Sequence, residues 1–294
     1  MIYIISLLGY GDNLITGSIL ESKDAESAGL RVVGSAITQK VWRLLRRPIQ
    51  PNVILYDESP GFYTLKESGL VAAIHDANSF RAWARKSLSR NDSIIFEKSA
   101  HLRHQWLLQG VGCARIEVHR SMNAYTDRSD VLSNYIGTHT WNLAVRPCGA
   151  ATSIFINPSA RSMDRTLSPQ IVETIVAVAN DENIKVTLVD THNNLWKYKE
   201  KVHRYILNPS LDEAVSALQH VDRYIGPDSF FMHLAYYLRI PQLALFWKND
   251  VYFQPPGLLN QSGIYYFDDL SNIVHFKRKL QTFIIGDVGV KSAI

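Results

Sequence analysis

The chain has 294 residues, 46% of them hydrophobic, which suffices for one large domain or two domains of ordinary size. Its 31 Lys+Arg against 27 Asp+Glu give a net charge of +4, far from the dense basic runs of a dedicated nucleic-acid binder. No apolar run reaches the ~18 residues needed to cross a membrane. Cys113 and Cys148 have no CxxC spacing and form neither a zinc-binding nor a disulfide framework, which favours the reducing cytoplasm. We therefore expect a cytoplasmic protein that binds no nucleic acid and contacts membranes, if at all, peripherally.

Short β-branched runs alternate with longer segments of helical character. We expect strands at 2–8, 31–34, 53–56, 71–74, 93–96 and 115–118 in the first half, and at 154–157, 186–189, 223–225 and 242–246 in the second. Apolar runs without strict alternation are typical of strands covered on both faces, and helical spacers between them indicate right-handed βαβ units. The pattern predicts an α/β fold with two Rossmann-like halves of roughly 145 residues each.

The first predicted strand leads into LLGYGDNLITG, residues 7–17. A dinucleotide-binding turn needs G-x-G-x-x-G, but Leu14 occupies its sixth position and Gly17 comes three residues too late. No acidic residue ends the second predicted strand, so a dinucleotide-dependent oxidoreductase is disfavoured. Two interpretations of Asp12 remain: a functional carboxylate at the mouth of the sheet, or a cap of the following helix. From this stretch alone, the cap is the better interpretation.

The middle of the chain, 141–152, carries a proline and a glycine without any helix or strand pattern. We expect a hinge there, with domains at 1–147 and 148–294. Two helices after it are well marked. Ser168-Pro169 is a helix cap followed by proline at the first helical position, and 211–221 has apolar residues at a three/four spacing.

The segment 224–247, YIGPDSFFMHLAYYLRIPQLALFW, combines a short strand, the polar pair Asp228-Ser229 and a helix with His233 one turn in. A helix N-terminus offers unpaired N–H groups and a positive dipole end, where a phosphate group binds. His233 can add a donor. In isolation, it is equally well interpreted as a helix histidine with satisfied hydrogen bonds.

This segment resembles the donor-binding motif of the heptosyltransferases, glycosyltransferase family 9. The family motif reads D-[ST]-G-x-x-H-L-A, followed by a proline and an apolar strand. The matching positions here are Asp228, Ser229, His233, Leu234, Ala235, Pro241 and 243–246. Phe230 departs from the motif, because it stands where the family has glycine. We expect its ring to crowd the backbone approach to a pyrophosphate.

The resemblance extends over most of the chain. In 154–175, Arg165 stands where the family has a lysine that meets the donor phosphates, and Gly11-Asp12 matches a G-D pair whose aspartate is taken as the catalytic base. The segments 208–218 and 93–118 resemble further family segments, the latter near the acceptor. The resemblance places Ser159 and Pro209 near the nucleotide and Arg103 at the basic acceptor position.

What the resemblance implies is a GT-B fold, two Rossmann-like domains with a cleft between them. The first domain binds the acceptor, a cell-envelope glycan or glycolipid, and the second binds a nucleotide-sugar donor. Asp12 is the expected base. Arg165, Ser229 and the helix after it are expected on the diphosphate, and Asp228 and His233 on the sugar or phosphate. The sequence lacks the Asp-x-Asp metal signature, so we expect inverting transfer without a metal or other cofactor. The alternative is an inactive GT-B-like binding module, with Phe230 as a sign of decay.

In the stretch KVWRLLRRPI, residues 40–49, four basic side chains surround Trp42, Leu44 and Leu45: Lys40, Arg43, Arg46 and Arg47. One interpretation is a solvated helix face. The other is a patch for an anionic membrane surface or a phosphorylated, lipid-linked acceptor, with Arg46 and Arg47 as binding residues. The family resemblance slightly favours the second.

Overall fold

The structure is a computed structural model that describes residues 1–21, 29–139, 141, 149–161, 163–249, 251–258, 263–270 and 272–286. The chain divides into two compact units, Met1–Thr140 and Trp141–Ile294. The predicted boundary at residues 147 and 148, most of the predicted hinge, and Cys148 lie outside the described residues.

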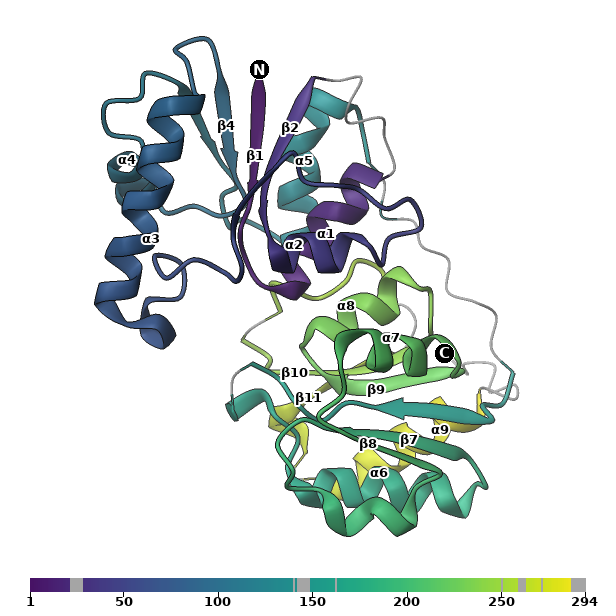
Figure 1. The fold of residues 1–294 in the computed structure, drawn as a ribbon. Coiled ribbons are helices and arrows are strands. Elements are labelled where there is room, and N and C mark those ends of the chain that lie inside the picture. Colours follow the sequence, from purple (N-terminus) through teal and green to yellow (C-terminus); the bar gives the residue numbers. More distant parts are fainter. Residues whose placement is uncertain are drawn as a thin grey trace. The chain divides into compact units, whose positions relative to one another are not determined.

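The first unit is a parallel sheet between two layers of helices. Its strands are β1 (Ile2–Ser6), β2 (Leu30–Ser35), β3 (Val53–Tyr56), β4 (Ser93–Phe96) and β5 (Ala114–Glu117), in the order β3-β2-β1-β4-β5. Its helices are α1 (Tyr10–Glu21), α2 (Ala36–Trp42), α3 (Leu65–Ser87), α4 (His101–Leu107) and α5 (Ala124–Ile136). Helices α3 and α4 lie on one side of this sheet, and α1, α2 and α5 on the other (Figure 1).

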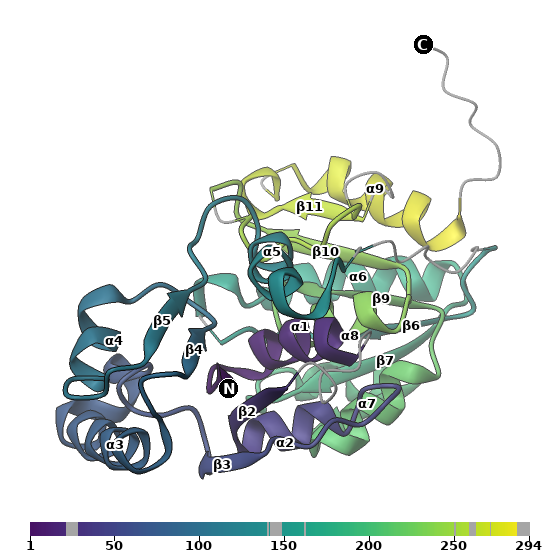
Figure 2. The same ribbon diagram turned by 90° about the horizontal axis from the view of Figure 1, so that it is seen from above.

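The second unit repeats this architecture around a parallel sheet of six strands. They are β6 (Ser153–Ile156), β7 (Lys185–Asp190), β8 (Arg204–Leu207), β9 (Arg223–Pro227), β10 (Gln242–Phe246) and β11 (Ile264–Tyr266), in the order β11-β10-β9-β6-β7-β8. The helices are α6 (Pro169–Asp181), α7 (Leu211–Gln219), α8 (Phe230–Tyr237) and α9 (Ile273–Ile285). Helices α6 and α9 pack side by side on one face of the sheet, while α7 and α8 lie on the other (Figures 1 and 2).

Both sheets reverse their strand order at an internal position. The chain begins each sheet in the middle, at β1 or β6, builds outward to one side, and then returns to place β4 or β9 on the other side. The two switch points are therefore β1/β4 and β6/β9. In open α/β sheets, ligands bind outside the carboxyl ends of the strands at such a point. The predicted α/β fold with two Rossmann-like halves is confirmed.

The strand predicted at 71–74 is wrong, because these residues belong to helix α3. Along this helix, Ala73, Ala77, Phe80 and Ala84 are buried, a spacing of three and four residues that places them on one face. Val71 is 85% exposed, so the apolar run VAAI does not enter the sheet. Strands β8 and β11, which the sequence pattern did not predict, are the two edges of the second sheet.

The two well-marked helices are confirmed as α6 and α7. The Ser168 side chain accepts a hydrogen bond from the backbone N–H of Ile171 at the start of α6. Ser210 caps α7 in the same way, accepting from the N–H of Glu213. Each cap satisfies a backbone donor that the first turn of a helix leaves unpaired.

Gly17 lies in α1, the helix that carries Asp12, at the position where α1 packs against α2. The Trp42 side chain is fully buried, and its Nε1–H donates to the Asn13 carbonyl oxygen at 2.8 Å. A Cβ atom at Gly17 would lie 2.5 Å from Trp42 Nε1 and 2.7 Å from its Cδ1. The absence of a side chain at Gly17 therefore permits the two helices to pack closely. This is the role of the glycine that does not fit the spacing of a dinucleotide-binding turn.

We predict that Gly17→Val destabilises the protein by about 1–3 kcal/mol, because the added atoms overpack the contact with Trp42. The matched control is Gly149→Val, at an exposed glycine where a Cβ would meet nothing within 4 Å. Denaturant unfolding of both variants measures the difference. Equal stability of the two variants would show that the contact with Trp42 does not constrain α1.

Candidate functional site

In the second unit, polar side chains bridge the switch point between β6 and β9. Asn157 follows β6, and its Nδ2 donates to the Ser159 carbonyl oxygen at 2.9 Å and to Ser229 Oγ at 3.4 Å. The Tyr224 hydroxyl lies 3.2 Å from the same Ser229 Oγ. A Cβ at Gly226 would lie 2.2 Å from the Tyr224 hydroxyl oxygen, so this position requires glycine.

Arg165 and Asp228 form an ion pair beside this bridge. Arg165 Nη1 donates to Asp228 Oδ2 at 2.6 Å, joining residues 63 positions apart. The N–H of Asp228 donates to the Leu245 carbonyl oxygen, which fixes Asp228 at the end of β9. His233 Nε2 lies 3.8 Å from Asp228 Oδ1. Three of the predicted donor residues thus meet in one place.

Helix α8 begins at this cluster, with Ser229 as its N-cap residue. The N–H groups of Met232 and His233 both donate to the Ser229 carbonyl oxygen. The N-terminus, with its positive dipole end, therefore lies at the carboxyl edge of the sheet. Phe230 is the first residue of the helix, and its half-buried ring packs edge-on against Phe231 at 5.3 Å between centroids.

Ser159 and Pro209 lie at the same edge of the sheet. Thr191, which follows β7, donates from Oγ1 to Ser159 Oγ at 2.6 Å. Pro209 follows β8 and is half-buried, and its neighbour Asn208 donates from its N–H to the Asp190 carbonyl oxygen. All the predicted donor residues therefore come from loops or helix starts that follow the carboxyl ends of strands.

In the first unit, Asp12 is the third residue of α1, so it is not the N-cap residue that one interpretation required. Its carboxylate instead accepts a hydrogen bond from Arg128 Nη2, an ion pair between α1 and α5. The Arg128 side chain is 4% exposed and that of Asp12 is 24% exposed. A buried guanidinium thus fixes a carboxylate that still reaches solvent. No sequence motif indicated Arg128, which lies 116 residues away on a helix.

A second polar bridge crosses the switch point between β1 and β4. Ser6 Oγ lies 2.8 Å from Asn13 Oδ1 and 3.0 Å from Glu97 Oε1. Burial raises the pKa of Glu97 to about 7, and the positive charge of Arg128 only partly opposes this. Glu97 directly follows the apolar strand β4. This position at the carboxyl end of a strand was the one feature of the sequence that could have indicated a site residue.

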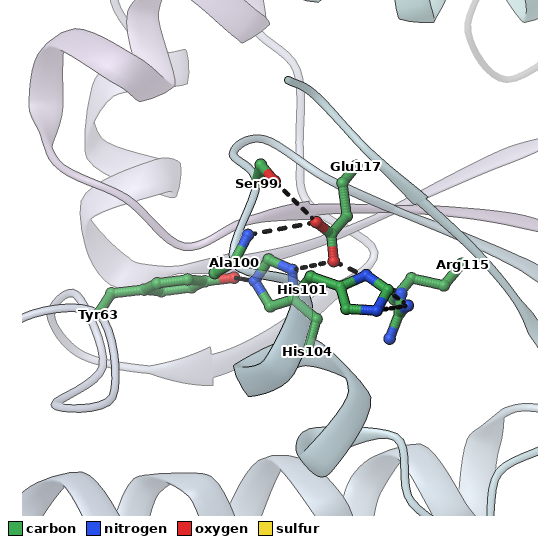
Figure 3. Close-up of polar contacts among 7 residues, drawn as sticks. All are labelled: Tyr63, Ser99, Ala100, His101, His104, Arg115 and Glu117. Atoms are coloured by element: carbon green, nitrogen blue, oxygen red, sulfur yellow. Dashed lines mark hydrogen bonds and ion pairs between the residues drawn. The ribbon is translucent and has the colours of Figure 1, made fainter. Parts of the chain in front are cut away.

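Arg103, the predicted acceptor residue, lies on α4 directly before His104, which belongs to a buried hydrogen-bonded network. The imidazole of His104 stacks on Phe96 with centroids 3.7 Å apart. Its Nδ1 lies 3.0 Å from Glu117 Oε1, and its Nε2 lies 2.9 Å from the Tyr63 hydroxyl. Figure 3 shows the imidazole between these two side chains.

The charges of this network follow from its contacts. Burial lowers the pKa of His104, so its imidazole is neutral at pH 7. Burial opposes ionisation of Glu117, but hydrogen bonds from His104 and Ser99 help to lower its pKa, and Arg115 Nε lies 3.4 Å from its carboxylate. Nδ1–H of His104 therefore donates to the Glu117 carboxylate. Nε2 accepts from Tyr63, whose pKa burial raises well above its usual value.

The basic stretch 40–49 divides into an inner and an outer set. Trp42 and Leu45 are buried in the first unit. The four basic side chains are exposed: Lys40, Arg43, Arg46 and Arg47. The backbone N–H of Arg47 donates to the Glu21 carboxylate at the end of α1. Trp42 and Leu45 therefore belong to the core, while Leu44 is half-buried. The exposed basic set suits both a solvated face and an anion-binding patch.

Within the described ranges, no group of three or more His, Cys, Asp or Glu residues is placed to hold a metal ion. None of the helices that the structure describes is long and apolar enough to cross a membrane.

No protein-family model and no curated protein matches the chain. Several solved structures do. A glycosyltransferase family 9 protein from Veillonella parvula matches with a TM-score of 0.64 at 15% identity, covering 95% of this chain and 89% of that one. The heptosyltransferase WaaC of E. coli, with ADP-2-deoxy-2-fluoro heptose, matches with a TM-score of 0.60 at 13% identity, covering 86% and 91%. The chain has the GT-B fold. The E. coli ADP-heptose lipopolysaccharide heptosyltransferase II also matches, with a TM-score of 0.58 at 14% identity over 97% and 98% of the two chains.

We predict that the His104 network destabilises the protein in acid. Because the folded-state pKa of His104 lies below its unfolded value, stability from its neutral form is present above pH ~6.5 and is lost as the pH falls. His104→Asn keeps a donor for Glu117 and removes the titrating ring, so its unfolding free energy should decline less between about pH 6.5 and pH 4.5. The control His75→Asn, at an exposed histidine, should follow the wild type. If the unfolding free energy of His104→Asn declined in acid as much as that of the wild type, the assignment of a neutral, buried His104 would be contradicted.

Proposed function

We propose that the protein is a glycosyltransferase that moves a sugar from a nucleotide-diphosphate donor to a glycan or glycolipid acceptor of the cell envelope. The single observation that carries this proposal is the cluster of Arg165, Asp228 and His233 at the N-terminus of α8. It lies where the strand order of the second sheet reverses. A cation with several donors and a helix N-terminus together form a site for a diphosphate.

In this proposal, the second unit is the donor domain. Diphosphate oxygens accept hydrogen bonds from Arg165, from the Ser229 hydroxyl and from the backbone N–H groups at the start of α8. Asp228 and His233 contact the donor sugar or its phosphate. The remaining donor residues lie around the nucleotide or the sugar: Ser159, Pro209 and Phe230. The ring of Phe230 forms an apolar wall in place of the glycine of family 9, which favours a donor adapted to that wall.

The first unit is the acceptor domain, and Asp12 is the catalytic base. The acceptor hydroxyl oxygen bonds to the anomeric carbon as the bond from that carbon to the diphosphate oxygen breaks. The hydroxyl proton passes to the Asp12 carboxylate, and one displacement inverts the anomeric configuration. Arg128 holds the carboxylate in orientation. The helix dipole and Arg165 stabilise the charge that develops on the leaving diphosphate, so the transfer needs no metal ion.

The acceptor is expected to carry negative charge. Arg103 lies beside the His104 network, and Arg46 and Arg47 are exposed after α2. These cations suit phosphate groups on a lipid-linked acceptor or an anionic membrane surface at the cytoplasmic side, where each nearby basic residue contributes about 1 kcal/mol.

We predict that Asp12→Asn lowers turnover by on the order of 10²-fold or more while donor affinity is kept, because the proton acceptor is lost and the side chain keeps its size. The control Asp130→Asn changes an exposed carboxylate on α5 and should retain wild-type turnover. Steady-state kinetics of the three proteins test this. Asp12→Asn turnover within a few-fold of the wild type would reduce Asp12 to a structural partner of Arg128.

We predict that Arg165→Ala weakens binding of a nucleoside diphosphate by ~1.5–3 kcal/mol, the range for hydrogen bonds to charged groups, and weakens binding of the bare nucleoside much less. Calorimetric titration in EDTA measures both affinities. Arg278→Ala, at an exposed arginine of α9, is the control and should bind both ligands as the wild type does. Equal losses for nucleoside and diphosphate, or a strict requirement for a divalent cation, would place the diphosphate elsewhere.

A further inference from the structure

The hydrogen bonds of Asn13 fix the orientation of its side-chain amide. Nδ2 donates to the carbonyl oxygens of Leu8 at 2.7 Å and Gly9 at 3.1 Å. The reversed orientation would place the amide oxygen against two carbonyl oxygens, with no donor between them. Asn13 Oδ1 therefore faces Ser6, and it can only accept a hydrogen bond.

The number of protons available to these contacts then favours one state of Glu97. Ser6 Oγ contacts both Asn13 Oδ1 and Glu97 Oε1, at 2.8 and 3.0 Å, and a hydroxyl has one proton to donate. That proton goes to Asn13 Oδ1, which has none of its own. The contact with Glu97 then needs a proton from Glu97. A neutral carboxylic acid supplies it, donating from Oε1 to Ser6 Oγ.

The surroundings of Glu97 agree with a neutral acid. Its side chain is 4% exposed, and burial raises its pKa to about 7. The negative charge of Asp12 on α1 raises this pKa further, while the positive charge of Arg128 on α5 and the hydroxyl groups of Thr16 and Ser6 lower it. Tyr63, which precedes α3, interacts electrostatically with Glu97 and is itself neutral, because burial raises its pKa. The ion pair with Asp12 engages the one cation among these groups.

The chain of hydrogen bonds ends at the turn that presents Asp12. It runs from Glu97 through Ser6 and Asn13 to the carbonyl groups of Leu8 and Gly9, the residues that lead into α1. We propose that Glu97, as a neutral acid, is a positioning residue for Asp12, acting through Ser6 and Asn13 on this turn. The proposal rests on the assignment of Asp12 as the catalytic base.

Ionisation of Glu97 reverses these contacts. The Ser6 hydroxyl must then donate to the Glu97 carboxylate, which leaves Asn13 Oδ1 without its donor. The new negative charge also competes with Asp12 for Arg128. Turnover should therefore decline above about pH 7, by roughly tenfold for each further pH unit if the ionised form is inactive.

Nuclear magnetic resonance tests the positioning without any activity. In the wild type, the backbone amide signals of Gly9, Gly11 and Asp12 should shift with a midpoint near pH 7. In Glu97→Gln, which offers an amide donor to Ser6 and cannot ionise, this titration should be absent. Glu97→Asp keeps a titrating carboxyl and should retain it, and Glu173→Gln, at an exposed glutamate of α6, should match the wild type. Persistence of the titration in Glu97→Gln would overturn the proposal, as would its absence from the wild type.

The kinetic test uses the ratio of turnover at about pH 8.5 to turnover at about pH 6. The ratio is formed within each variant, so that differences in absolute turnover between variants do not enter. This ratio should fall tenfold or more in the wild type, in Glu97→Asp and in Glu173→Gln, and should stay within about twofold in Glu97→Gln. A wild-type decline in Glu97→Gln would overturn the proposal. If no sugar nucleotide is turned over even by the wild type, the proposed function fails, and the amide titration alone then decides whether Glu97 positions the turn.

Discussion

The reversal of strand order in each sheet is the constraint on which the candidate site of each unit depends. Neighbouring parallel strands whose connections leave in opposite directions open a crevice at their carboxyl ends. At this position the first unit has the contact between Ser6 and Glu97, and the second has the contact between Asn157 and Ser229. The residues that we assign to chemistry and to the donor lie directly beside these two bridges.

The ion pairs beside the two bridges differ in which partner is exposed to solvent. In the second unit, Arg165 pairs with a buried carboxylate while a quarter of its own side chain stays exposed, so a cation remains within reach of a ligand. In the first unit the burial is reversed: the guanidinium of Arg128 is buried, and the carboxylate of Asp12 is the exposed partner. A partly exposed cation suits a diphosphate, and a partly exposed anion suits proton abstraction from a hydroxyl.

The sequence predicted the architecture from local signals, and it predicted the residues that we propose for the donor from the family resemblance. Each of these signals is contiguous in the chain: the apolar strands, the Ser168-Pro169 cap and the segment from Asp228 to His233. The run 71–74 misled because four apolar residues fit a buried strand and a helix turn equally well. Arg128 and Tyr63 could not be predicted, since their roles come from partners 116 and 41 residues away. The core position of Trp42, which removed it from the predicted basic patch, likewise depends on Gly17 of another helix.

The most direct test of the account is the release of free nucleotide when the wild-type protein is incubated in EDTA with ADP-, GDP-, UDP- and CMP-sugars. A glycosyltransferase transfers sugar slowly to water when no acceptor is present, so we expect at least one sugar nucleotide to be consumed, with matching release of its nucleotide. Absence of release from every donor would contradict catalysis and would identify the protein as a binding module with the GT-B fold.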